Sequence, residues 1–437
     1  MNNTTIQLLN KYNSSNTKIL DISNLNICGI LDMDIFIELE ELDCSFNSIT
    51  QIINLSESLK YLNCYSNKIT KIVYLPNDIT GLNCKSNPLK ELYYPFYVKP
   101  KKYPKLITHL TFGWAFNLPI DNLPNSITHL TFGWAFNHPI DNLPNSITHL
   151  TFDGNFNLPI NNLPNSITDL TFGNNFNLPV DSLPNSITHL TFGNDFNLPI
   201  NNLPNSITHL TFGWAFNKPV DSLPNSITHL TFGWTFNCPV DSLPNSITHL
   251  TFGNDFNLPV NNLPNSITHL TFGDEFSKPV DSLPHTITSL TFGYNFSKPV
   301  DSLPNSITSL TFGNDFNHPI DNLPNSITHL TLGGYFNQPI DNLPNSITHL
   351  TFNIESDFNQ EINNLPNSIT HLIFGKYYNI PKWIIDDEEL NCAIRFFKND
   401  YITFKKRGSV KEFISIYKGD DIFDEFYKYI IPIEDQK

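Results

Sequence analysis

One histidine recurs at a fixed place in most units of a 20-residue repeat, and imidazole readily gains or loses a proton near neutral pH. We number each unit from the Leu of Thr-His-Leu as position 0, so that this histidine stands at position −1. Eleven of the fourteen histidines stand there: His109, His129, His149, His189, His209, His229, His249, His269, His329, His349 and His371. In the remaining units the place is taken by Asp169, Ser289 and Ser309.

The residues around this histidine have the two-residue period of a β-strand, because apolar positions 0 and +2 flank a polar threonine at +1. Positions −1 and +1 should then point outward, as parallel columns of His and Thr on the exposed face of a sheet. The candidate exposed column comprises His129, His149, His189, His209, His229, His249, His269, His329 and His349. It is either a solvated polar column copied with each repeat or a recognition surface that changes charge near pH 6.

Neighbouring imidazoles on adjacent strands, about 5 Å apart, oppose each other's protonation. We therefore expect lowered pKa values for interior members of the run from His189 to His269. A metal site needs three or four convergent ligands, which a flat column offers poorly, so we expect no metal.

A second candidate site lies where the copies differ, at positions +4, +5 and +8. Position +4 is aromatic in five units, which makes the candidate binding rim Trp114, Trp134, Trp214, Trp234 and Tyr294. Tryptophan anchors many interfaces, and the pairs Trp114/Trp134 and Trp214/Trp234 should stack as neighbours. The alternatives are drift at tolerant surface positions, or tryptophans that pack over the next turn.

Catalytic motifs do not stand out. There is no phosphate-binding loop, nucleophile elbow or His-Glu-x-x-His, and the Ser of Leu-Pro-Asn-Ser-Ile-Thr recurs too often to mark one catalytic centre. The six cysteines form no paired Cys-x-x-Cys motifs. Three of them, Cys44, Cys64 and Cys84, are expected at position +2 in the core, where later units have Phe. We expect no enzyme activity, no catalytic residues and no cofactor.

The repeat itself organises nearly the whole chain. Its 20-residue period holds from Leu110 through Leu350 and resumes at Leu372 after a two-residue insertion. The N-terminal part keeps the period with another motif, Leu-x-Cys-x-x-Asn, which begins at Leu42, Leu62 and Leu82. A period of this length is typical of a solenoid, which grows by stacking units.

These motifs resemble known repeats. L-x-x-L-x-C-x-x-N-x-I in residues 39–49 and 59–69 resembles a leucine-rich repeat. The F-N-x-P-I element, as in residues 116–120, resembles the FNIP repeat, a relative found in social amoebae and in giant DNA viruses of amoebae. The resemblance covers roughly residues 17–380. Members of that family often carry an N-terminal F-box, and the about 18 residues before the first repeat are too few for one.

The predicted fold is a leucine-rich-repeat-like solenoid, with short parallel strands on one face and irregular, Pro-rich or 3₁₀ returns on the other. Two prolines per unit, such as Pro139 and Pro144, remove backbone donors and oppose an α-helix. Asn117 and its copies should turn inward and bond backbone groups. The predicted core of one unit is Leu130, Phe132, Phe136, Ile140, Leu143 and Ile147.

We expect five segments along the chain. They are an N-terminal cap (1–19), leucine-rich-repeat-like units (20–92), an irregular insertion (93–105), FNIP-type units (106–375) and a small mixed C-terminal cap (376–437). The last segment is alternatively a docking tail for a partner.

Charge and hydropathy limit which classes of partner the chain can bind. Lys+Arg is 25 and Asp+Glu is 41, and the net charge of −16 disfavours nucleic acid and anionic membranes. The polar start has no secretory signal, and no stretch approaches the about 20 apolar residues that cross a bilayer. We therefore expect an intracellular, cytoplasmic protein without a nucleic-acid or membrane partner.

Together these features predict a non-enzymatic scaffold that presents a repetitive face to a protein partner. Two alternatives stay open. One is a passive structural rod without a specific ligand, and the other is a substrate-binding component of a ubiquitin-ligase system without its own F-box.

Overall fold

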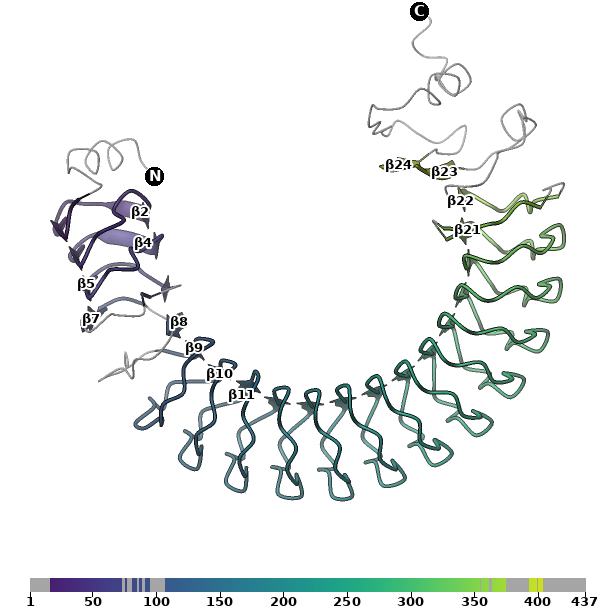
Figure 1. Ribbon diagram of the computed structural model, residues 1–437, viewed down its shortest axis with the longest axis horizontal. Helices are drawn as coiled ribbons and strands as arrows, with labels where there is room; N and C mark the ends of the chain where they lie inside the picture. Colours follow the sequence, from purple (N-terminus) through teal and green to yellow (C-terminus); the bar gives the residue numbers. More distant parts are fainter. Residues whose placement is uncertain are drawn as a thin grey trace, which may run out of the picture. The chain divides into compact units, whose positions relative to one another are not determined.

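The computed structural model describes residues 16–72, 75–76, 81–84, 86–88, 91–94, 107–353, 355–360, 364–374, 393–398 and 400–403. The chain forms two compact units, Met1–Lys218 with Ser222–Ile227, and Pro219–Asp221 with Thr228–Lys437. Within each unit the chain coils so that short strands line one side and loops the other (Figure 1). This is the predicted solenoid.

Each later repeat contributes one strand of three or four residues that begins at position −1. In the first unit these strands are β9 (His109–Phe112), β10 (His129–Phe132), β11 (His149–Phe152), β12 (Asp169–Thr171), β13 (His189–Thr191) and β14 (His209–Thr211). In the second they are β15 (His229–Thr231), β16 (His249–Thr251), β17 (His269–Thr271), β18 (Ser289–Thr291), β19 (Ser309–Thr311), β20 (His329–Leu332), β21 (His349–Phe352) and β22 (His371–Phe374). Neighbours pair in parallel and in register, so His129 lies opposite His149 and Leu130 opposite Leu150.

The core consists of continuous columns of identical side chains. All six predicted core positions of the unit that begins at Leu130 are buried. Two of the columns are phenylalanines: the rings of Phe132 and Phe136 stack 3.9 Å apart within the repeat, and Phe132 stacks on Phe152 of the next repeat at 5.4 Å. Stacking between neighbours therefore continues from repeat to repeat, which is how a unit too small to fold alone becomes stable.

The returns are irregular turns, as the prolines predict, and the part of the chain that the structure describes contains no helix in residues 107–353. One turn of each repeat is closed by a hydrogen bond between residues i and i+3, in which the N–H of Ile147, for example, donates to the carbonyl of Pro144. After most strands the backbone of position +3 runs close to the same position in the preceding repeat. A Cβ at Gly253 would overlap the carbonyl of Gly233, which explains a glycine column that our sequence analysis missed.

The N-terminal repeats differ because each contributes two strands to two sheets. One sheet is β1 (Ile19–Asp21), β3 (Glu41–Asp43), β5 (Tyr61–Asn63) and β7 (Gly81–Asn83). The other strands are β2 (Cys28–Asp32), β4 (Ser48–Ile53), β6 (Lys71–Ile72) and β8 (Glu91–Tyr94), and β8 pairs with β9.

The pairing of β8 with β9 corrects one prediction. The column of Leu110 continues into Leu92 and Ile72, whereas Leu42 belongs to the separate sheet. The three cysteines are buried as predicted, but they follow the strands of that sheet and do not take the place of Phe. Each N-terminal repeat contains two segments with strand alternation, and only the pairing decides which one continues into the later repeats.

Asparagine is used differently in the two kinds of repeat. Asn67 is buried, donates through Nδ2 to the carbonyls of Cys44 and Cys64, and accepts from the N–H of Ile49 through Oδ1. Asn137 is exposed. Within the described residues its side chain forms one hydrogen bond, in which Oδ1 accepts the N–H of Asn157. The prediction that the later column turns inward is therefore wrong, because Phe136 and its copies fill the interior at that point.

At its far end the sheet adds β23 (Ala393–Lys398), parallel to β22, and β24 (Asp400–Thr403), antiparallel to β23. The remainder of the predicted C-terminal cap, the insertion beyond Tyr94 and residues 1–15 lie outside the described residues. Over the described ranges no helix has the length and apolar character to span a membrane.

Candidate functional site

The strands place the histidines on the outward face as predicted, and in-register pairing stacks their rings. Ring centroids lie 4.0 Å apart for His109 and His129, and again for His129 and His149. In the second unit, stacks at 4.2 Å join His229, His249 and His269, and further stacks at 4.2 Å join His329, His349 and His371. We call these three sets the histidine triads. His189 and His209 form a further stacked pair at 4.3 Å.

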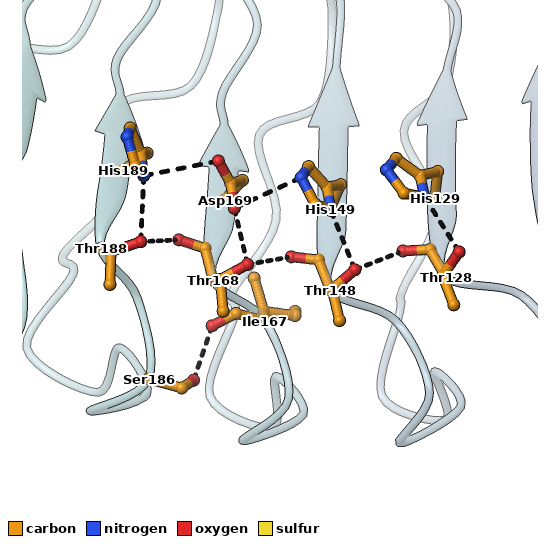
Figure 2. A network of polar contacts seen from close by, with 10 residues as sticks. All are labelled: Thr128, His129, Thr148, His149, Ile167, Thr168, Asp169, Ser186, Thr188 and His189. Atoms are coloured by element: carbon orange, nitrogen blue, oxygen red, sulfur yellow. Dashed lines mark hydrogen bonds and ion pairs between the residues drawn. The ribbon is translucent and has the colours of Figure 1, made fainter.

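Each imidazole is tethered by the threonine that precedes it, at position −2. His129 Nδ1 lies 2.9 Å from Thr128 Oγ1, and His149 Nδ1 lies 2.8 Å from Thr148 Oγ1. The same hydroxyl of Thr148 lies 3.2 Å from the carbonyl oxygen of Thr128 (Figure 2). The threonines thus form a ladder of their own, which fixes the orientation of the histidine rings. Sequence analysis missed this tether, although the Thr-His pair recurs at a constant place.

Asp169 interrupts the column and contacts both neighbouring histidines. Its Oδ2 lies 3.4 Å from His149 Nε2, and its Oδ1 lies 3.5 Å from His189 Nδ1 (Figure 2). It also accepts a hydrogen bond of 2.6 Å from Thr168 Oγ1, so the aspartate occupies the place that imidazole Nδ1 takes in other units. A carboxylate within the column therefore contacts the ring nitrogens of the histidines on both neighbouring strands.

The central histidine of every triad has a lowered pKa. For His129, His249 and His349 the largest cause is partial burial, and the charges of the two flanking histidines lower the pKa further. Asp169 acts in the opposite direction on His129. The prediction is confirmed for His249, although burial contributes more than the mutual repulsion on which it was based. The lowered pKa favours the neutral form of each central imidazole at neutral pH.

Thr148, His149 and Asp169 bring a hydroxyl, an imidazole and a carboxylate together, which are the groups of a hydrolase triad. The Thr–His contact recurs in units without a carboxylate, including the unit of Thr348 and His349. It is therefore a feature of the ladder and does not single out one reactive hydroxyl. Over the described residues, no group of three His, Cys, Asp or Glu side chains could hold a metal ion.

The aromatic side chains of the candidate rim are exposed. Trp114 and Trp134 stack with centroids 5.5 Å apart, as predicted, and remain 61% and 41% exposed. Trp134 also leans over the next repeat, where a side chain on Gly154 would collide with its indole. Trp214, Trp234 and Tyr294 are likewise exposed.

Sequence analysis missed Tyr335, which stands one position further along its unit than Tyr294. Tyr335 is 51% exposed, and its interaction with Tyr294 raises the pKa of Tyr335. The two tyrosines therefore form a second aromatic patch, in the second unit.

The buried thiols are unsuited to chemistry. Burial raises the pKa of Cys44 to about 12 and that of Cys84 to about 11, and it raises the pKa of Cys64 as well. A thiol with such a pKa stays protonated at neutral pH and is a poor nucleophile. The three cysteines pack as small apolar side chains, which agrees with their predicted role in the core.

Parallel in-register strands, irregular returns and columns of identical side chains define a leucine-rich-repeat-like solenoid. The family model described as FNIP Repeat matches eleven segments that together run from residue 99 to residue 382. The chain belongs to the FNIP repeat family. No curated protein matches it.

A solved structure, that of CroV588, supports the same fold. CroV588, a giant-virus protein described as a novel circular leucine-rich-repeat structure, is 35% identical, with a TM-score of 0.54 over 82% of this chain and 69% of that chain. YopM from Yersinia enterocolitica WA-314 is 18% identical, with a TM-score of 0.41 over 90% of this chain and 93% of that chain.

Proposed function

We propose that this protein is a non-enzymatic scaffold that binds a protein partner through its aromatic rim. Leucine-rich-repeat-like solenoids are typically used to bind proteins, and this repeat fold is typically non-catalytic. The net charge of −16 disfavours nucleic acid as the partner.

One observation carries the proposal: two large indoles, Trp114 and Trp134, stack on each other and stay exposed. Core positions are nearly invariant among the repeats, whereas position +4 varies between Trp, Tyr, Asn, Asp and Gly. Variable positions on an invariant scaffold are suited to specific recognition, and tryptophan is enriched among residues that dominate binding energy.

The experiment is affinity capture of partners with the full chain and with the double variant W114N/W134N. Asparagine already stands at position +4 in other units, for example Asn174, so the variant should keep its fold. We expect the variant to lose a partner that the unchanged chain captures reproducibly, at a cost of about 2 kcal/mol or more for a central tryptophan.

The matched control is N174A/N194A, which changes two rim positions that carry no aromatic side chain. It should retain the partner. No specific capture by any of the three proteins would favour the passive structural rod, whereas equal specific capture by all three would exclude this rim as the binding surface.

A further inference from the structure

The threonine ladder determines which nitrogen of each histidine carries the proton. Thr128 Oγ1 has one proton and two acceptors in reach, the Thr108 carbonyl at 3.2 Å and His129 Nδ1 at 2.9 Å. That carbonyl already accepts the backbone N–H of Thr128 at 2.8 Å and of His129 at 3.0 Å. These two bonds occupy both lone pairs of the oxygen. The hydroxyl proton is therefore better placed on Nδ1.

The unit in which aspartate replaces histidine supports the same direction. Thr168 Oγ1 donates to Asp169 Oδ2, and an ionised carboxylate can only accept. The threonine of this ladder is thus a donor to the residue at position −1. A neutral histidine that accepts through Nδ1 carries its own proton on Nε2, at the outer edge of the ring.

The triads then present rows of N–H donors on neighbouring strands. The clearest case is His329, His349 and His371, which lies between Ser309 and Ala393 in the register of the sheet. Among the described residues, the charged groups that act on the pKa of His349 are the imidazoles of His329 and His371.

The other two triads differ in one respect. In the part of the chain that the structure describes, His229 and His269 are the charged groups that act on the pKa of His249, whereas Asp169 joins His109 and His149 in acting on His129. The first triad therefore has a carboxylate of its own beside it, at His149 Nε2. No carboxylate of the described residues acts on the central histidine of either other triad.

We propose that the triads His229–His249–His269 and His329–His349–His371 bind individual carboxylate side chains of the protein partner, and bind them more tightly when the imidazoles are protonated. The inference rests on the proposed function for the existence of a protein partner. Asp169 supplies the model for the contact, since its carboxylate lies against Nε2 of a histidine in the same column.

Protonation adds charge without changing the outer donor. The incoming proton goes to Nδ1, which then donates to the threonine hydroxyl. The hydroxyl proton turns to the threonine carbonyl of the preceding repeat as a third, weaker donor to that oxygen, and Thr348 Oγ1 already lies 3.1 Å from the Thr328 carbonyl oxygen. Nε2–H still points outward, now from an imidazolium. A bound carboxylate stabilises the charged ring and offsets the repulsion within the triad.

The tautomer is tested first, by ¹⁵N NMR of the histidine rings in the full chain near neutral pH. We expect the Nε2–H tautomer for the triad histidines. Nδ1–H rings in the triads would overturn the donor-row geometry and with it the proposal.

The second test measures binding of a fluorescent oligoglutamate peptide at about pH 7.5 and about pH 5.5, at a fixed salt concentration of about 0.15 M. Glutamate stays largely ionised at both values, so the change in charge lies on the protein. We expect about tenfold tighter binding at the lower pH, from several weak ion pairs.

The test variant replaces the six triad histidines of the second unit with serine, the residue that the chain itself carries at Ser289 and Ser309. It should lose the pH-dependent binding, whereas the control H138S/H318S, outside the column, should keep it. Binding that is equal at the two pH values, or that survives in the six-serine variant, would overturn the proposal.

The rim variant W114N/W134N separates this inference from the proposed function. It should still bind the peptide. Conversely, tryptophan-dependent capture of a partner together with pH-independent peptide binding would leave the proposed function standing and remove only the role of the triads.

Discussion

The N-terminal repeats and the later repeats have the same 20-residue period, but different side chains stabilise their interiors. In the N-terminal repeats a buried amide, such as that of Asn67, bonds backbone groups from two successive turns, and small thiols fill the space beside it. In the later repeats two phenylalanines per unit fill the interior, and the asparagine lies outside. A fixed period therefore does not require a fixed interior.

The outer faces differ as well. In the strands that continue into the later repeats, position −1 carries Gln51, Lys71 and Glu91 before the histidines begin at His109. Imidazoles of identical type can stack in register, whereas this mixture of charges cannot. The column of stacked imidazoles is thus confined to the later repeats. The N-terminal repeats can therefore serve as an internal control for effects that depend on histidine.

The largest expected difference concerns the interior. Phe256 is fully buried, stacks on Phe252 at 3.9 Å and lies between Phe236 and Phe276 at 6.1 Å each. We expect F256A to lower the free energy of unfolding by about 3–5 kcal/mol, because it removes a large side chain from a packed column. C64A removes only a sulfur atom and should cost about 1 kcal/mol. Urea unfolding of both variants measures the difference, and equal costs would refute a dominant aromatic interior.

A smaller effect should come from the asparagines. N67A leaves an N–H and two carbonyls of the buried turn without their partner, and we expect a loss of about 3 kcal/mol. N157A removes one exposed bond, to the N–H of Asn177, and should cost less than about 0.5 kcal/mol. Urea denaturation again provides the measurement. A cost for N157A as large as that for N67A would mean that the two asparagines do the same work.

The smallest effect should be the dependence of stability on pH. The pKa of His349 is lowered in the folded chain, so the unfolded chain binds more protons as pH falls below about 6.5. Stability is therefore fully present above that value and is lost on acidification, by at most about 1.4 kcal/mol per pH unit for each proton. Hydrogen exchange between about pH 7 and about pH 5, corrected for the intrinsic rate, should show lost protection in β21 and unchanged protection in β4. Equal losses in both strands would show that the histidines are not the cause.

The sequence predicted the features that repeat and missed those that depend on pairing or on hydroxyl geometry. The core positions of the unit of Leu130 were predictable because each recurs in every later unit. The register of Leu42 was not, since its repeat contains two strand-like segments and the sequence does not state which one pairs with the later strands. Outward histidines followed from alternation. Their contact with Thr128 and its equivalents depends on where Oγ1 lies relative to Nδ1. The spacing of residues in the sequence does not give that position.

Because the columns are in register, the number of repeats can change without changing how one repeat packs on the next. Because Leu130, Phe132 and Phe136 meet copies of themselves in the next unit, removal of 20 residues would join two surfaces that already match. The same identity makes the strands ambiguous during folding, since a strand displaced by one whole unit meets an equivalent partner. Residues that differ between repeats, such as Asp169, then distinguish one repeat from its neighbours in an otherwise uniform array. They distinguish one alignment from its neighbours where the interior does not.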